Sequence, residues 1–160
     1  MKLKIAFAGF RHGHIFSLYD KVLRNPALEL TAVCEEDETA SLLPTRPDVK
    51  LTDRDFDEML RRADCDIIAI GDYYAKRGSL AARALKAGKH VIADNPLCTS
   101  LAELDEIERL AETSGCKVGC MYELRSVPNF ATARELIRGG TLGKITQIQF
   151  GGQHPLMRGS

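Results

Sequence analysis

The sequence predicts an α/β protein with a doubly wound, mostly parallel sheet and helices on both faces. Three observations predict this class. Strand and helix signals alternate along the chain, which is the pattern of parallel strands joined by crossover helices. The first strand signal, over residues 3–8, passes through Gly9 into an amphipathic helix. Residues 65–70 carry the apolar run of a strand that is buried on both faces.

Apolar spacing and end signals locate the individual elements. In the first helix Ile15, Leu18 and Val22 recur with the helical period, and Pro26 ends the helix. Ser100 and Glu103 form a capping box at the start of a later helix. Strands are expected over residues 3–8, 28–34, 49–51, 65–70, 90–93 and 117–121, and helices over residues 14–25, 54–62, 79–87, 100–113 and 128–138. Thr52 or Asp53 is expected to cap the second helix, residues 40–47 to form a helical turn and loop, and residues 72–78 to form a polar loop.

The end of the chain has a different pattern. Residues 146–150 alternate polar and apolar side chains, as a half-exposed antiparallel strand does. Such a strand needs a neighbour, so we expect it to be the first strand of a missing second α/β domain. We therefore predict one domain over residues 1–122, followed by a linker helix and the start of a truncated second domain over residues 123–160.

Composition limits the function classes. Lys plus Arg and Asp plus Glu both number 22, so no net charge recruits nucleic acid or an anionic membrane. No apolar run approaches the roughly 20 residues of a spanning helix, and no signal peptide pattern is present. The five cysteines form no C-x-x-C pair, and Cys116 and Cys120 are expected to face the core. These features indicate a protein of the reducing cytoplasm.

Residues 4–14 predict a phosphate site, because a strand, a glycine turn and a helix N-terminus present backbone N–H groups and a favourable dipole to an anion. The dinucleotide fingerprint G-x-G-x-x-G reads Gly9, Arg11 and His14 here, with an extra glycine at Gly13. Only the tight-turn glycine is kept. Arg11 or the loop backbone is expected to meet the pyrophosphate, although Arg11 could equally project into solvent.

An acid follows the second strand at the place where a dinucleotide's ribose is usually held. Glu35 lies 26 residues after Gly9, close to the spacing that such an acid takes. Together with Glu36 and Asp37 it would repel a 2′-phosphate, which favours NAD over NADP. The alternative is a solvated acidic turn.

Polar side chains follow two further strands. Gly71, Asp72 and Tyr73 come after the strand over residues 65–70, and Asp94, Asn95 and Pro96 come after the next. Ligands bind at the carboxyl ends of parallel strands, so these segments are expected on one edge of the sheet. An ordinary surface loop is the alternative for residues 72–74. Arg77 is interpreted as a helix-start residue.

A histidine pair offers a second kind of site. His12 and His14 have a spacing compatible with metal binding, but no third ligand is evident nearby in the sequence. We therefore predict no metal.

Four ordered segments identify a family. Residues 4–14, Ala87-Gly-Lys-His-Val-Ile92, Asp94-Asn-Pro-Leu97 and Leu136-Ile-Arg-Gly-Gly-Thr-Leu-Gly143 together resemble the N-terminal half of the Gfo/Idh/MocA oxidoreductases. The resemblance implies a Rossmann domain that binds NAD or NADP, and hydride transfer to or from a sugar or polyol held by a second domain. It implies a cofactor site built from Gly9, Phe10, Arg11, His12, Gly13, His14, Glu35, Gly71, Asp72, Tyr73, Asp94 and Pro96.

One departure bears on catalysis. Asn95 occupies the position of the family's lysine, and an amide cannot carry the positive charge that stabilises a developing alkoxide. We expect this chain alone to be a poor catalyst. The alternative function is a non-catalytic dinucleotide-binding or interaction module. Pairing of the last strand with a second copy would give a homo-oligomer, which the sequence leaves open.

Overall fold

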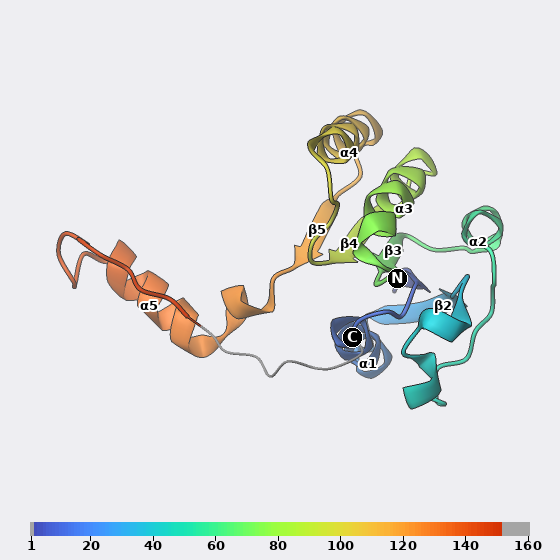
Figure 1. Ribbon diagram of the computed structural model, residues 1–160, viewed down its shortest axis with the longest axis horizontal. Coiled ribbons are helices and arrows are strands. Elements are labelled where there is room, and N and C mark those ends of the chain that lie inside the picture. Colours follow the sequence, from blue (N-terminus) through green and yellow to red (C-terminus); the bar gives the residue numbers. More distant parts are fainter. Residues whose placement is uncertain (1, 152–160) are drawn as a thin grey trace. The chain divides into compact units, whose positions relative to one another are not determined.

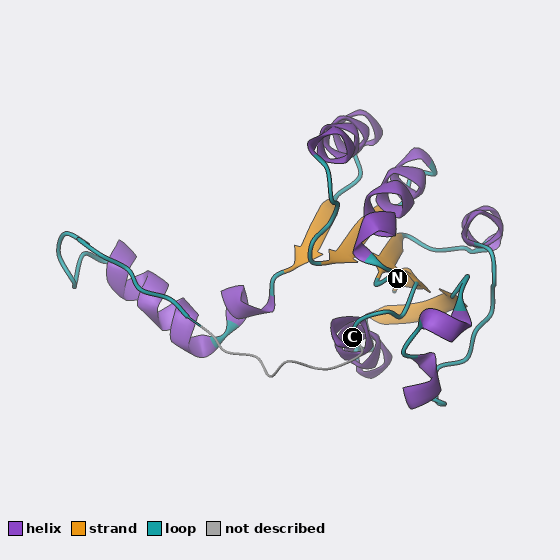
Figure 2. Cartoon of the chain, viewed as in Figure 1, coloured by secondary structure: helices purple, strands orange, loops and turns teal. Residues whose placement is uncertain are grey.

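The computed structural model describes residues 2–151. The chain divides into two compact units, Met1–Tyr122 and Glu123–Ser160. All strands of the described residues belong to the first unit, and Figure 2 shows them in orange among the purple helices. The end of the segment that we predicted as the start of a second domain lies outside the described residues.

The first unit is built on one five-stranded sheet. Its strands are β1 (Leu3–Ala8), β2 (Leu28–Cys34), β3 (Ile67–Ile70), β4 (His90–Asp94) and β5 (Val118–Met121). Their order in the sheet is β2-β1-β3-β4-β5, and every neighbouring pair is parallel. The predicted fold class is confirmed.

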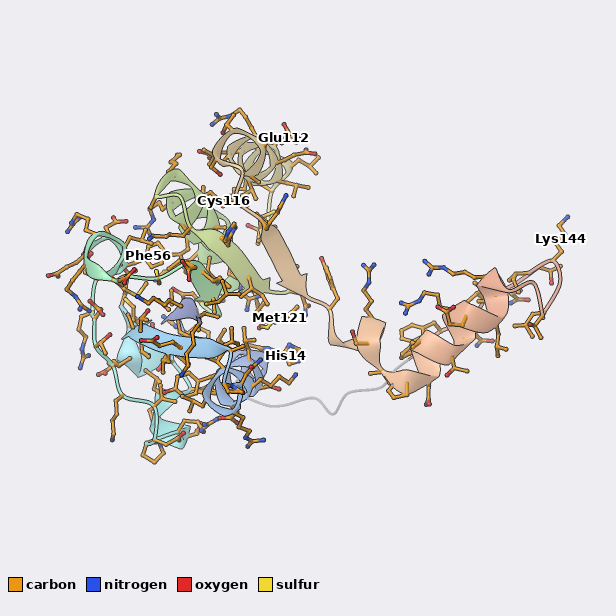
Figure 3. The ribbon with its side chains drawn as sticks, turned by 180° about the vertical axis from the view of Figure 1, so that it is seen from behind. His14, Phe56, Glu112, Cys116, Met121 and Lys144 are labelled. Carbon is orange, nitrogen blue, oxygen red and sulfur yellow. The ribbon has the colours of Figure 1, made fainter. Side chains whose placement is uncertain are left out.

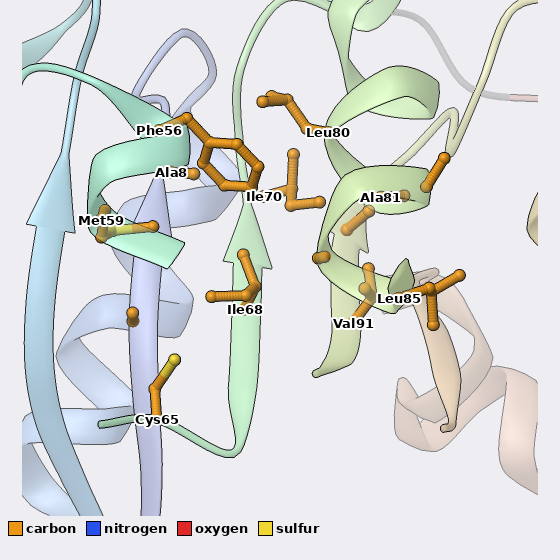
Figure 4. Close-up of a cluster of buried hydrophobic side chains, with 14 of the residues drawn as sticks. Ala8, Phe56, Met59, Cys65, Ile68, Ile70, Leu80, Ala81, Leu85 and Val91 are labelled. Atoms are coloured by element: carbon orange, nitrogen blue, oxygen red, sulfur yellow. The ribbon is translucent and has the colours of Figure 1, made fainter. Parts of the chain in front are cut away.

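Helices cover both faces of the sheet (Figure 1). One face packs against α1 (Gly13–Arg24), and the other against α2 (Phe56–Arg62), α3 (Tyr74–Lys86) and α4 (Leu101–Ser114). Successive strand side chains point to opposite faces, so Ile5 and Phe7 join the cluster on α1 while Ala6 and Ala8 join the other cluster. Figure 4 shows part of this second cluster, where Phe56 and Leu80 lie over Ile70. The doubly wound pattern therefore follows from strands that are apolar on both sides.

The predicted third strand is wrong. Residues 49–51 form no strand, and a single bridge between Cys34 and Asp53 takes its place beside β2. The Thr52 hydroxyl oxygen accepts from the Val33 N–H at 2.9 Å, where a strand carbonyl would extend the ladder. The helix that follows is capped by Asp55, whose side chain accepts from the Glu58 N–H, rather than by Thr52 or Asp53.

The predicted polar loop over residues 72–78 is largely helical. α3 begins at Tyr74, five residues before the expected start, and it contains Gly78. A Cβ at Gly78 would lie 2.6 Å from Cδ of Glu103 on α4, at the far end of a flexible side chain that can shift. The loop prediction depended on polarity and on Gly78, but α3 continues through this glycine.

The second unit contains a short helical turn, Glu123–Ser126, and α5 (Pro128–Arg138), whose bounds match the prediction. Residues 146–150 form no strand, contrary to expectation. A strand requires a hydrogen-bonded neighbour, and none of the described residues supplies one there. No helix of the described residues is long and apolar enough to cross a membrane.

Candidate functional site

The loops that follow β1, β3 and β4 meet at one edge of the sheet. These strands are adjacent and parallel, so their carboxyl ends lie side by side. β1 leads into residues 9–12, β3 into residues 71–73, and β4 ends at Asp94 before Asn95 and Pro96. β2 lies on the other side of β1, so the strand order reverses between β1 and β3. Open α/β sheets bind ligands at such a reversal.

Two glycines let these loops touch. Gly9 has a φ of +80°, and a Cβ there would lie 2.4 Å from Cβ of Asp72. A Cβ on Gly71 would lie 2.5 Å from Cβ of Ile15 on α1. The Arg11 N–H donates to the Gly71 carbonyl at 2.9 Å. A Cβ on Gly13 would meet no described atom within 4 Å, so packing does not require the extra glycine of the loop.

The helix α1 begins at this edge, and Figure 3 labels His14 on its first turn. His12 is the N-cap residue, with an extended backbone. At a helix N-terminus the first N–H groups have no partner within the helix, and the dipole is positive. The strand, the turn and the start of the helix thus have the arrangement that binds phosphate groups in many nucleotide-binding proteins.

Glu35 is turned into the protein. Its Oε2 accepts from the Phe10 N–H at 2.8 Å, and its Oε1 accepts from the Asp37 N–H at 3.1 Å. The side chain is fully buried, whereas Glu36 is exposed. Burial raises the pKa of the Glu35 carboxyl, against the two backbone N–H groups that lower it. Binding of ribose by Glu35 stays a prediction, and its observed contacts shape the loop.

The side chain of Phe10 is in the hydrophobic core. It is fully buried, and its ring packs near those of Phe7, Phe16 and Tyr19. Only its backbone belongs to the loop, so a cofactor contact by Phe10 would be through the main chain.

Arg11 lies among carboxylates. Its Nε is 3.5 Å from Oδ1 of Asp72 and 3.8 Å from Oε1 of Glu35, and its Nη2 is 3.6 Å from Oδ2 of Asp37. The side chain is largely buried, which excludes the alternative that it projects into solvent. Its charge is therefore already balanced by protein acids at the place where we predicted a pyrophosphate contact.

The loop after β3 has one buried acidic residue followed by two partly exposed tyrosines. Asp72 is buried, and its Oδ1 accepts from the Tyr73 N–H at 2.6 Å. Tyr73 and Tyr74 are about half exposed, with ring centroids 4.6 Å apart. A cavity of about 10 Å³, with room for about one water, lies beside Gly9, Glu36, Phe56 and Asp72.

Arg77 joins two of the loops, a role that sequence reasoning missed. It is 1% exposed, and its Nε donates to the Asp72 carbonyl at 2.6 Å. Its Nη1 donates to the carbonyl of Asn95 at 2.6 Å, and its Nη2 lies 3.3 Å from Oδ2 of Asp94. A buried guanidinium with these partners fixes the ends of β3 and β4 to each other.

A signal for this role was present. Arg77 stands three and four residues before Leu80 and Ala81, so it extends the buried stripe of α3. A charged residue on an apolar stripe needs a buried partner, and in the structure Arg77 pairs with the buried carboxylate of Asp94. The mistaken start of the helix at residue 79 hid this position.

Asn95 and Pro96 are held by the neighbouring strands. The Asn95 side-chain amide donates to the Met121 carbonyl at 2.9 Å, which ties the ends of β4 and β5. The peptide bond between Asn95 and Pro96 is cis, and Pro96 is exposed. The Asn95 amide, which we predicted to stand where the family has a lysine, thus bonds a neighbouring strand.

The cysteines are free thiols, most of them in buried surroundings. All five are free, and burial raises the pKa of Cys34 to about 12. Burial also raises the pKa of Cys120, while Cys116 is buried. Cys116 belongs to the core, as predicted, whereas Cys120 is only partly buried and belongs to neither core cluster.

Comparison with known proteins gives the family. The model of an oxidoreductase family with an NAD-binding Rossmann fold, Gfo/Idh/MocA, matches residues 3–122. The chain belongs to this family. Its NAD-binding Rossmann fold is the one described above.

Individual similar proteins match only part of this chain and at low sequence identity. The uncharacterized oxidoreductase YhhX of Escherichia coli is 32% identical over 95 residues, which are 59% of this chain and 28% of YhhX. The D-xylose dehydrogenase of Paenarthrobacter nicotinovorans is 26% identical over 95 residues, which are 59% of this chain and 24% of that enzyme.

A solved structure shares the fold. Lactobacillus casei scyllo-inositol dehydrogenase, with NAD(H) and scyllo-inositol bound, superposes with a TM-score of 0.77 at 22% identity. The match covers 91% of this chain and 44% of that enzyme. The chain therefore spans less than half the length of these relatives.

Proposed function

We propose that this Gfo/Idh/MocA chain provides the NAD site of an oxidoreductase that transfers a hydride between NAD and a sugar or polyol. The observation that carries the proposal is the convergence of the loops after β1, β3 and β4 on the N-terminus of α1. A D-xylose dehydrogenase and a scyllo-inositol dehydrogenase among the similar proteins support a polyhydroxylated substrate.

The residues at this edge fit a dinucleotide. Gly9 and Gly71 keep side chains out of the two crowded turns, and the first turn of α1 offers N–H groups to a pyrophosphate. We infer that Asp72, Tyr73, Asp94 and Pro96, which follow β3 and β4, lie beside the nicotinamide half. A bound nicotinamide supplies the hydride acceptor or donor, and the work of this chain is to bind and orient it.

The acidic turn after β2 supports NAD rather than NADP. Glu35, Glu36 and Asp37 follow one another there, and they would repel the additional phosphate of NADP. Arg11, which could have attracted that phosphate, is already placed among Glu35, Asp37 and Asp72.

The substrate side requires residues outside the first unit. At position 95 an amide replaces the family's lysine, so no side chain there stabilises a developing alkoxide by charge. We infer that the second unit, residues 123–160, begins the substrate domain, which is supported by the short span of the chain relative to its relatives. The chain alone is then expected to bind NADH with little turnover.

A calorimetric titration of the chain with NADH and NADPH tests the cofactor proposal. NADH is expected to bind, and NADPH more weakly. Gly9→Ala should weaken NADH binding, because the added Cβ collides with Asp72, whereas Gly13→Ala is the matched control that meets no described atom. Failure of the folded chain to bind NADH at millimolar concentration contradicts the proposal.

The ribose contact has its own test. Glu35→Gln and Glu36→Gln change adjacent residues, one buried and one exposed. If Glu35 accepts from the ribose, as predicted, its variant weakens NADH binding more than the Glu36 variant does. The opposite ranking would assign the contact to the exposed acid.

A non-catalytic dinucleotide-binding module is the second candidate function, and Asn95 favours it because its amide is engaged by the Met121 carbonyl. The two functions separate in a chimaera that joins this chain to the second domain of a family relative. Asn95→Lys in that chimaera should give NAD reduction with a polyol if the chain is an oxidoreductase domain. Bound NADH without any activity would support the module.

A further inference from the structure

Two histidines and a buried aspartate meet at the start of α1. His12 is the N-cap residue and His14 lies on the first turn, while Asp94 is the last residue of β4. One ligand atom from each of the three residues lies within 4.8 Å of those from the other two. The rings of His12 and His14 are 4.2 Å apart between centroids and nearly perpendicular. The fold thus brings a third side chain with a possible metal-binding atom to the two histidines.

Both imidazoles lie close to the Asp94 carboxylate. Nδ1 of His12 lies 3.0 Å from Oδ2 of Asp94, and Nδ1 of His14 lies 3.1 Å from Oδ1. In a tetrahedral zinc site with bonds of about 2.0–2.1 Å, neighbouring ligand atoms are about 3.3 Å apart. Each separation is close to that spacing, but the two go to different oxygens of Asp94. An ion held by both imidazoles would therefore take both carboxylate oxygens, or one oxygen with the three ligand atoms drawn together from within 4.8 Å.

The Asp94 carboxylate is held by buried partners, whereas the two imidazoles are partly exposed to solvent. Asp94 is fully buried, its Oδ1 accepts from the Asn95 N–H at 2.9 Å, and its Oδ2 lies 3.3 Å from Nη2 of Arg77. Partners of this kind orient metal-binding carboxylates in proteins. The side chains of His12 and His14 are 50% and 36% exposed, so an ion and its waters can reach them.

We propose that His12, His14 and Asp94 bind a divalent first-row transition metal ion, with Zn²⁺ as the representative. Two imidazoles and one carboxylate suit such ions, whereas Ca²⁺ and Mg²⁺ prefer sets made of oxygen ligands. Arg77 and the positive end of α1 oppose a cation, so the affinity is below that of closed structural zinc sites. The competing arrangement is a pair of Nδ1–H to carboxylate hydrogen bonds that only orients the rings.

The test is a titration of the untagged, chelator-treated chain of 160 residues with ZnCl₂ by calorimetry. One ion per chain is expected. His12→Ala and His14→Ala should each weaken binding at least about 10-fold, because each removes one ligand. His90→Asn is the matched control: Nδ1 of His90 accepts from the Lys117 N–H, and the amide oxygen of asparagine preserves that acceptor. It should leave zinc binding unchanged.

Cobalt absorption identifies the ligands, because the chain also has five free cysteines. Co²⁺ bound by imidazole and carboxylate gives d–d bands without the intense thiolate charge-transfer band. Equal Zn²⁺ affinity in the wild type and both histidine variants, a thiolate band, or no binding by the folded wild type would each overturn the proposal. Circular dichroism establishes that the variants are folded. A titration of the metal-free chain with NADH reports on the proposed cofactor function separately.

Discussion

Two buried carboxylates at the same edge of the sheet differ in the partners that lie closest to them. Asp94, at the end of β4, faces the guanidinium of Arg77 and the imidazoles of His12 and His14. Glu35, just after β2, accepts from the backbone N–H groups of Phe10 and Asp37. The side-chain partners of Asp94 come from the loop after β1, from α1 and from α3, whereas Glu35 connects the loops after β1 and β2.

The difference indicates which contacts, when removed, should lower the free energy of unfolding most. A buried charge whose cationic partner is removed keeps its full desolvation penalty. Backbone N–H groups cannot be removed by changing one side chain. At Glu35 the effect of burial on the pKa is larger than the effect of these N–H groups, since the pKa of the carboxyl is raised. We therefore expect large effects around Asp94 and small, pH-dependent effects around Glu35.

The largest effect is expected for Arg77→Met. Methionine has a similar length but leaves Asp94 buried without its guanidinium, and it removes the donors to the carbonyls of Asp72 and Asn95. Loss of one partner of a buried ion pair costs about 3–5 kcal/mol, which urea unfolding measures directly. The NADH affinity should also fall, because the loops after β3 and β4 lose their connection.

Arg83→Met on the same helix is the control. Arg83 pairs with Asp57 at 2.9 Å and lies over the ring of Phe56, but both charged side chains are partly exposed. An exposed pair contributes roughly 0–1 kcal/mol, so this loss should be much smaller. Equal losses for Arg77→Met and Arg83→Met would show that the connection at Asp94 is not what stabilises the edge.

An intermediate effect is expected for Gly9→Ala, because Gly9 lies between the two carboxylate systems. Its N–H donates to the Cys34 carbonyl next to Glu35, and its Cα faces the backbone of Asp72, which Arg77 holds. A positive φ and a Cβ collision together cost about 2–3 kcal/mol. Thermal unfolding should show this loss for Gly9→Ala, while Gly13→Ala should be neutral or gain about 0.5 kcal/mol. Similar melting temperatures for the two variants would mean that the loop relaxes around the methyl group.

Local pattern and topology were enough to predict much of this edge. The alternation of strand and helix signals gave the parallel sheet, and parallel strands necessarily bring Gly9, Asp72 and Asp94 to one side of it. The bounds of β2 and α5 match the prediction because turn residues or Pro delimit them in the sequence.

Side-chain pairing across the edge could not be predicted. The partnership of His12 and His14 with Asp94 depends on how α1 leaves the turn at Gly9, over a separation of some 80 residues. The prediction of a third strand was also wrong because of one side-chain hydrogen bond. The Thr52 hydroxyl oxygen accepts from the Val33 N–H, where a backbone carbonyl was expected to do so. A sequence pattern reports which residue types are near in the chain, but it does not report which hydrogen bond prevails between distant segments.

The smallest effect, and the sharpest test of the comparison, is the pH dependence at Glu35. Because burial raises the pKa of this carboxyl in the folded state, the folded chain binds more protons than the unfolded chain above the ordinary glutamate pKa of about 4.5. Stability contributed by Glu35 therefore falls as the pH rises from about 4.5 through the raised pKa, and is constant above it. The free energy of unfolding of the wild type minus that of Glu35→Gln, measured in urea at a series of pH values, should decline over this window.

Glu106 supplies the opposite control. Its ion pair with Lys86 lowers the pKa of its carboxyl, so its contribution to stability grows as the pH rises. A wild-type minus Glu35→Gln difference that rises with pH, as for Glu106→Gln, would show that the N–H groups of Phe10 and Asp37 outweigh burial.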